Sequence, residues 1–307
     1  IVVGSWSGSY GGGINPVSWN GSGNILAKYA KYRAPVKYGQ CWVFCGVLCT
    51  VLRTCGIPAR CVTTYNSFHD HDGSLAWEMY FNRFLRPVHF RRQETMWNFH
   101  CWNEGWMDRK DLPPGHGGWQ IIDSTPQERS QGYFRCGPAS QVAVKEGNVD
   151  LLYDTGFVFA EVNADKIFYY QQPNGGFRIA RIDHHIVGRS ISCKSVGLNT
   201  REDITSSYKY PDNSQAEKLI QSKIQSRRRR YREISKSPVR VEIFSPQYVT
   251  WKADCVINFK MTNFSNTTVK TKFRVLITCV SYRGRVNSTL LNQMYETIIG
   301  ANMEKPF

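Results

Sequence analysis

The chain has 307 residues, with 39 lysines and arginines against 24 aspartates and glutamates, so its net charge is +15 at pH 7. This length predicts one large domain with part of a second, and 10 cysteines are too sparse for a disulfide-scaffold protein. No apolar run reaches the ~18 residues of a membrane-spanning helix, which excludes such a segment.

The chain begins at Ile1 without an initiator methionine, a basic leader or a cleavage site, so we expect it to be a fragment of something longer. The cysteine content predicts reduced thiols and a cytoplasmic location. An extracellular location stays open because the chain has Asn-x-Ser/Thr sequons at Asn20, Asn263, Asn266 and Asn287.

The first long helix is predicted directly after Cys41. The preceding residues are rich in glycine, serine and tryptophan, with a short helical pattern over residues 23–32. The run from Trp42 to Arg53 is apolar nearly all round and ends at Gly56-Ile57-Pro58, a typical helix stop. We therefore expect a buried helix with Cys41 at its N-terminus.

Strand-like runs follow from Ala59, at residues 61–65, 75–81, 97–102, 119–122 and 156–162. A central helix on an antiparallel sheet predicts an α+β domain over residues 1–220. The polar segment from Asp212 to Lys236 is first helical in pattern and then becomes the charge run Arg227–Arg230. It predicts an exposed basic linker over residues 221–236. Residues 237–307 alternate as strands at 239–244, 254–262, 271–282 and 290–299, which predicts an incomplete all-β sandwich or barrel.

Cys41 has the setting of a reactive thiol, because a helix N-terminus and a nearby imidazolium both lower a thiol pKa. His100 lies in an aromatic strand, and Asp123 closes an apolar strand where an unpaired carboxylate would be costly. These residues predict a nucleophile, a base and an orienting acid, although a packing role for Cys41 and His100 stays open. The other histidines are expected at the surface or in turns: His69, His71, His116, His184 and His185.

Five ordered segments resemble the catalytic core of animal calcium-dependent transglutaminases. They are Tyr38–Phe44, Thr54–Arg60, Trp97–His100, Asp123–Glu128 and Phe157–Asp165. The resemblance covers about residues 1–220, and the later strands resemble the start of the family's first C-terminal β-barrel. It implies a papain-like core without the family's N-terminal β-sandwich.

The resemblance implies a protein-glutamine gamma-glutamyltransferase that works through a cysteine thioester. Cys41 would attack a glutamine side chain, and His100 would protonate the departing ammonia. The acyl group would pass to a protein lysine or a polyamine. The family's oxyanion donor and tunnel wall fall at Trp6 and Trp97.

Calcium is the cofactor that the resemblance implies, with two sites in this chain. The first comprises Asp70, Asp72 and Ser74 in one loop, closed by Glu94, and it is not an EF-hand because Phe81 stands where the bidentate Glu is required. The second joins Asn163 and Asp165 to Asp212 and Glu217.

Three alternatives remain at this stage. A glutamine deamidase or cysteine protease could use the same three residues, and a structural relative could lack catalysis. A basic module could bind polyanions through Arg227–Arg230, but no motif specific for nucleic acid is present. The same run also motivates a hypothesis of activation by trypsin-like cleavage. The sequence makes no prediction of the oligomeric state.

Overall fold

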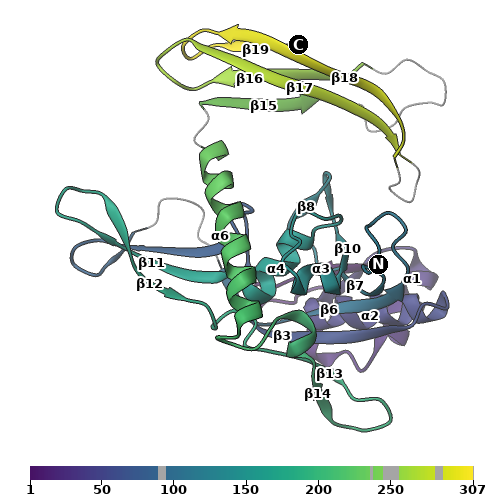
Figure 1. Ribbon diagram of the computed structural model, residues 1–307. Coiled ribbons are helices and arrows are strands. Elements are labelled where there is room, and N and C mark those ends of the chain that lie inside the picture. Colours follow the sequence, from purple (N-terminus) through teal and green to yellow (C-terminus); the bar gives the residue numbers. More distant parts are fainter. Residues whose placement is uncertain (89–94, 236–237, 245–255, 281–285, 307) are drawn as a thin grey trace. The chain divides into compact units, whose positions relative to one another are not determined.

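The computed structural model describes residues 1–88, 95–235, 238–244, 256–280 and 286–306 (Figure 1). The chain divides into two compact units, residues 1–228 and 229–307, and the boundary falls inside the predicted linker. None of the helices within these ranges is long and apolar enough to cross a membrane.

The first unit is built on a six-stranded antiparallel sheet in the order β10-β7-β6-β3-β13-β14. The strands are β3 (Ala59–His69), β6 (Thr95–Met107), β7 (Gly118–Asp123), β10 (Cys136–Ser140), β13 (Ser190–Lys194) and β14 (Arg201–Asp203). The ladder of β3 and β6 pairs Thr64 with His100. Both residues are fully buried, so the centre of the sheet lies in the core.

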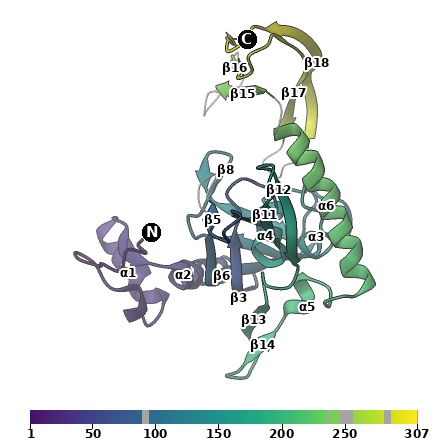
Figure 2. The same cartoon turned by 90° about the vertical axis from the view of Figure 1, so that its left-hand side faces the viewer.

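Helix α2 (Cys41–Thr54) packs against β6 and β3, and it begins at Cys41 as predicted (Figures 1 and 2). Gly56 follows its end with a φ of +79°, a conformation that favours glycine after a helix. The α+β architecture predicted from this helix and the antiparallel sheet is confirmed. The segment before it contains β1 (Val2–Gly4), a 3-10 turn (Pro16–Ser18), α1 (Ser22–Tyr32) and β2 (Val36–Gly39).

Residues 156–162 were expected as a strand, and this prediction is wrong. They form helix α4 (Thr155–Asn163), which packs against β3 and β10. Because the segment is almost entirely buried, its apolar run shows no helical periodicity that would distinguish it from a core strand. Glu161 faces the core from this helix with no exposed surface.

A second sheet has the order β12-β11-β4-β5, in which β11 and β4 are parallel and the other pairs are antiparallel. Its core contains Ala76, Ile167 and Tyr169. The remaining short elements of the first unit connect the sheets. These strands and elements are β4 (Ala76–Phe81), β5 (Pro87–Val88), β11 (Asp165–Gln171), β12 (Phe177–Asp183), β8 (Arg129–Ser130), β9 (Tyr133–Phe134), α3 (Gln141–Lys145) and α5 (Thr205–Tyr208).

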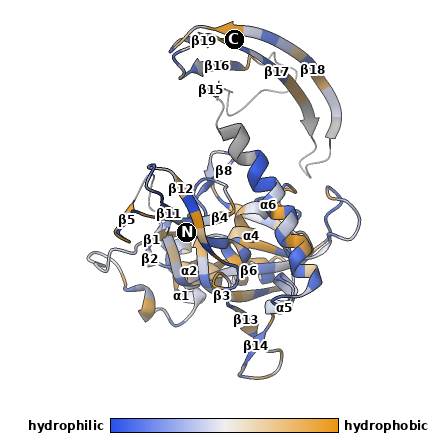
Figure 3. Cartoon of the chain, turned by 60° about the vertical axis from the view of Figure 1, so that its left-hand side comes forward, coloured by the Kyte–Doolittle hydropathy of each residue, from blue (hydrophilic) through white to orange (hydrophobic). Residues whose placement is uncertain are grey.

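The predicted basic linker is helical. Helix α6 (Gln215–Ser235) runs through the arginine run, and Figure 3 shows hydrophobic patches among its hydrophilic residues. Ile220 and Ile224 bury one face of the helix. Arg228 is buried as well, whereas Arg229 and Arg230 are exposed, so the run is a helical segment with one buried arginine and not the uniformly exposed hinge that was expected. The prediction missed the burial of Arg228 because its partner, Asp165, lies 63 residues away in the sequence.

The C-terminal unit is all-β, as expected of a partial sandwich. Strands β15, β16 and β19 form one antiparallel sheet, and β17 pairs with β18 in another. The two sheets meet where Phe259 packs against Phe273, with 5.4 Å between ring centroids. The strands are β15 (Val239–Phe244), β16 (Asn258–Asn263), β17 (Val269–Val280), β18 (Val286–Ile299) and β19 (Glu304–Pro306).

Candidate active site

The N-terminal strand places Trp6 beside the start of α2. Strand β1 pairs in parallel with β2, and the backbone N–H of Ser5 donates to the carbonyl of Gly39 (3.1 Å). The side-chain amide of Gln40 donates to the carbonyl of Ser5 (2.9 Å). A Cβ at Gly4 would lie 2.5 Å from the Trp6 ring, so glycine gives the indole its space. Trp6 is thereby held at the first turn of α2, where it stacks on Phe44 with 6.4 Å between ring centroids.

His100 and Asp123 form a buried pair on the adjacent strands β6 and β7. The Nε2–H of His100 donates to Oδ2 of Asp123 (2.7 Å), and both side chains are almost inaccessible to solvent. The other acid oxygen accepts the backbone N–H of Thr125 (2.8 Å). Nδ1 of His100 is buried and has no hydrogen-bond partner in the part of the chain that the structure describes. This nitrogen is therefore available to a reacting group.

Gln127 and Glu161 complete the polar core around this pair, and the sequence-based reasoning assigned neither a role. The side-chain amide of Gln127 donates to Oδ2 of Asp123 (2.7 Å) and to Oε1 of Glu161 (2.9 Å). Oε1 of Glu161 also lies 3.8 Å from Nε2 of His100. An acid inside the apolar run 156–162 was the available signal, because such a residue needs a partner.

The balance of charge in this core favours a protonated imidazole. Burial lowers the pKa of His100, but the charge and hydrogen bond of Asp123, together with Glu161, raise it to about 9. Burial also raises the pKa of Glu161 to about 8. Near neutral pH, His100 is therefore charged and can give up a proton, while Glu161 is largely neutral.

Cys41 lies in a buried cluster of thiols with Cys45 and Cys101. The hydrogen bond with Cys101 and burial raise the pKa of the Cys41 thiol. The same contact lowers the pKa of Cys101 to about 7. In this arrangement Cys41 is protonated and interacts with a second thiol, so its transfer of a proton to His100 requires that it leave Cys101.

A cavity of about 360 Å³ lies between the predicted tunnel residues. Trp6 meets the edge of Trp97 at 5.9 Å between ring centroids, and Trp97 lies 4.9 Å from the ring of His100. Trp6 keeps 44% of its surface exposed, so this wall opens to solvent. The full lining is Trp6, His69, Thr95, Met96, Trp97, Pro126 and Gln127. The two tryptophans thus line one entrance near His100.

The first predicted calcium site is a loop folded around Asp70. Its two carboxylate oxygens accept the backbone N–H groups of Gly73 and Leu75, both at 2.9 Å. Oδ1 of Asp72 accepts the N–H of Ser74 (3.0 Å). Burial, with the charge of Asp72, raises the pKa of Asp70 to about 6. A buried carboxylate beside a second acid fits a hard cation; Glu94 lies outside the described residues.

The residues of the second predicted calcium site fall into two separate groups in the structure. Asp165 accepts hydrogen bonds from Nδ1 of His184 (2.7 Å) and from Arg228 (2.9 Å), so these groups already neutralise its charge. Asn163 ends α4 just before it. The structure brings Asp212 and Glu217 together, with Nδ1 of His185 at 3.1 Å and 3.6 Å from their oxygens. Nδ1 of His185 is buried and makes no hydrogen bond of normal geometry with the described residues. This nitrogen and the two acids together fit a cation.

The expectation that His69 lies at the surface or in a turn is wrong. It ends strand β3 with 8% of its surface exposed, and it contacts Glu128. The period of two did not reveal this because the last three residues of β3, Ser67–His69, are all buried, so side chains on both faces of the strand are covered there.

Comparisons with known proteins, in sequence and in fold, agree with the resemblance to transglutaminases. Residues 23–124 match the model of the transglutaminase-like superfamily. The chain is 50% identical to bovine protein-glutamine gamma-glutamyltransferase E over 222 residues, which are 72% of this chain and 32% of the relative. It is 50% identical to human protein-glutamine gamma-glutamyltransferase 6 over 228 residues, 74% of this chain and 32% of the relative.

The crystal structure of red sea bream transglutaminase matches the fold with a TM-score of 0.66 and 39% identity, over 100% of this chain and 45% of that one. The chain spans about a third of the length of the curated relatives that it matches. These similarities confirm the resemblance: the chain belongs to the transglutaminase family.

Proposed function

We propose that this chain carries the catalytic centre of a protein-glutamine gamma-glutamyltransferase. The observation that carries the proposal is the buried His100–Asp123 pair with its unpartnered Nδ1, because His100 packs against Trp97 and Trp97 packs against the thiol cluster of Cys41. Asp123 fixes the imidazole by holding Nε2, which leaves Nδ1 for proton transfer.

In the first half-reaction, the Cys41 sulfur attacks the side-chain amide carbon of a glutamine. The neutral form of His100 takes the thiol proton on Nδ1 and then gives it to the departing nitrogen, so that a C–S bond replaces a C–N bond and ammonia leaves. The charge that develops on the amide oxygen needs donors. We assign this role to the backbone N–H of Cys41 and the indole N–H of Trp6.

In the second half-reaction, a primary amine from a protein lysine or a polyamine attacks the thioester carbon. The C–N bond forms, the C–S bond breaks, and the amine proton returns to sulfur through His100. The aromatic walls of Trp6 and Trp97 suit the alkyl stem of such an amine and limit access of water. This favours transfer over hydrolysis.

Calcium is the cofactor we propose. Asp70, Asp72 and Ser74 would hold one ion, and Asp212 with Glu217 would hold another. When bound, calcium supplies positive charge that neutralises these carboxylates and orders their loops. The first loop directly follows β3, the strand that pairs with the strand of His100. Ordering this loop therefore acts on the sheet that carries the imidazole.

The proposal is tested by incorporation of a labelled primary amine into a glutamine-rich protein. The full chain and its Cys41→Ala variant are compared, first with calcium and then with a chelator. We expect incorporation by the unchanged chain with calcium only. Cys41→Ala should reduce it to background because no thioester can form.

Two other results would contradict the proposal. Release of ammonia without incorporation identifies a hydrolase that uses the same residues. Absence of both reactions in the folded chain with calcium identifies a structural relative. An Asp72→Asn variant serves as the control for calcium, since it should raise the calcium concentration required and leave Cys41 intact.

A further inference from the structure

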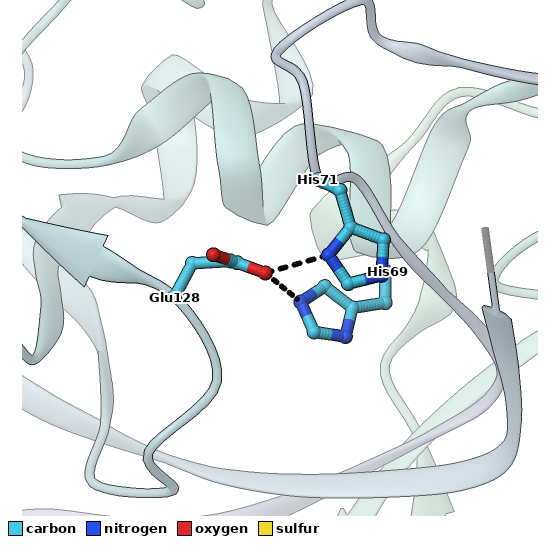
Figure 4. A group of neighbouring side chains, drawn as sticks. All are labelled: His69, His71 and Glu128. Atoms are coloured by element: carbon cyan, nitrogen blue, oxygen red, sulfur yellow. Dashed lines mark hydrogen bonds and ion pairs between the residues drawn. The ribbon is translucent and has the colours of Figure 1, made fainter. Parts of the chain in front are cut away.

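A second cluster of imidazoles and a carboxylate lies outside the His100–Asp123 pair. His69 ends strand β3, His71 follows in the next loop, and Glu128 comes from the loop after β7. Figure 4 shows both rings directed at the same oxygen of Glu128. Oε1 lies 3.1 Å from Nε2 of His69 and 2.6 Å from Nδ1 of His71.

The cluster is held in place and remains reachable. The His69 and His71 side chains keep 10% and 12% of their surface, and Glu128 keeps 33%. The two rings pack at 4.1 Å between centroids, and Phe157 packs edge-on against His69 at 5.7 Å. The imidazoles are therefore fixed, while the carboxylate opens a path for a small ion.

The donor atoms are those of a transition-metal site. One nitrogen from each ring and one carboxylate oxygen lie within 4.8 Å of one another. Imidazole nitrogens suit Zn²⁺, Cu²⁺ and Ni²⁺, whereas Ca²⁺ requires oxygens. Neighbouring donors around a tetrahedral zinc ion lie about 3.3 Å apart, as follows from bonds of about 2.0 Å. A small outward movement of Glu128 would open the cluster to this spacing.

We propose that His69, His71 and Glu128 bind a divalent transition-metal ion, with Zn²⁺ as the representative. The three residues supply two nitrogens and one oxygen, the ligand set of open zinc sites that keep a fourth position for water or another ligand. The site shares no ligand with the oxygen-rich loop of Asp70 and Asp72, although His71 lies between them in the sequence.

The position of His69 gives the ion a place near the reaction site. His69 lines the same cavity as Trp6 and Trp97, so a bound ion would stand at the wall of that cavity. If the cavity admits the acceptor amine, which rests on the proposed function, the ion competes with the amine for this entrance. Binding of the ion itself does not depend on that function.

The test is a titration of the full chain with Zn²⁺ alone, followed by competition with a chromogenic chelator. We expect about one tightly bound ion per chain. His71→Gln and Glu128→Gln should each weaken binding by more than about tenfold, the least that loss of a ligand's partner costs. Asp72→Asn is the matched control from the same loop and should bind as the unchanged chain does.

Binding of Co²⁺ separates this site from the buried thiols. We expect a spectrum without thiolate-to-cobalt charge transfer, and its bands should be lost in His71→Gln while circular dichroism stays unchanged. Equal affinity in the unchanged chain, His71→Gln and Glu128→Gln would overturn the proposal. A strong thiolate band that survives in His71→Gln would also overturn it, as would an equal loss in Asp72→Asn. These readouts need no turnover, so their failure is distinct from failure of the proposed function.

Discussion

His100 uses its two nitrogens differently, and this difference organises the site. Nε2 is held by Asp123, while Nδ1 is buried without a partner in the described part of the chain. A buried polar atom without a partner is costly, and it is accepted where a substrate or reacting group completes the contact. The imidazole is thus oriented for proton transfer before any substrate binds.

The contact with Cys101 should restrain the reactivity of Cys41. Cys101→Ala removes the main cause of the raised Cys41 pKa, so alkylation of Cys41 by iodoacetamide should speed up near neutral pH. Each whole unit by which the pKa falls raises the thiolate fraction about tenfold. The pH profile of alkylation, mapped to Cys41 by mass spectrometry, measures the effect.

Cys45→Ala is the control for this prediction. Its thiol belongs to the same cluster but donates to the carbonyl of Trp102 (3.0 Å). An equal shift of the pH profile in Cys45→Ala, or no shift in Cys101→Ala, would show that the contact between Cys41 and Cys101 does not set the pKa.

Glu161 should help to keep His100 charged at high pH. The pKa of His100 is raised from 6.5 to about 9, so its charged form stabilises the fold fully below pH 6.5. That contribution, about 3 kcal/mol, is lost as the pH rises to about 9. Glu161→Gln removes one negative charge and should lower the pKa of His100 towards 6.5, which moves this loss to lower pH.

The measurement is urea unfolding across this pH range, combined with an NMR titration of the His100 ring. Glutamine keeps the shape of Glu161 and can still accept from Gln127, so the variant should fold. An unchanged His100 titration in Glu161→Gln would contradict the assigned coupling.

At the scale of elements, helices α4 and α6 make buried contacts that the sequence pattern does not predict. Helix α4 brings Glu161 to the active site, and α6 brings Arg228 to Asp165 at 2.9 Å. Both side chains of the latter pair keep only 8% of their surface. A buried ion pair between residues 63 apart in sequence fixes α6 to the first unit.

Arg228→Met should therefore destabilise the first unit. We expect a loss of about 2 kcal/mol, below the ~3–5 kcal/mol of a fully uncompensated buried charge, because His184 still pairs with Asp165. Arg230→Met changes an exposed arginine of the same run and should stay within about 0.5 kcal/mol. Urea unfolding compares the two, and equal losses would contradict a specific role for Arg228.

At the scale of the whole molecule, the local chemistry of the site was predictable and its long-range contacts were not. A thiol before an apolar helix and an acid at a strand end make Cys41 and Asp123 candidate site residues, because each pattern is local. The role of Glu161 was not predicted because a fully buried helix lacks a periodic pattern of polar and apolar residues. The contact of His71 with Glu128 joins residues 57 apart, which no local spacing encodes.

The pairing of Thr64 with His100 makes the active site sensitive to the number of residues in the chain. Neighbouring side chains on a strand point to opposite faces, so removing one residue of β6 ahead of His100 would move the imidazole to the place of Phe99, which is 40% exposed. The turn between β11 and β12, at residues 172–176, can change its number of residues without shifting the register of His100. Insertions and deletions in related chains should therefore collect in that hairpin and spare β6.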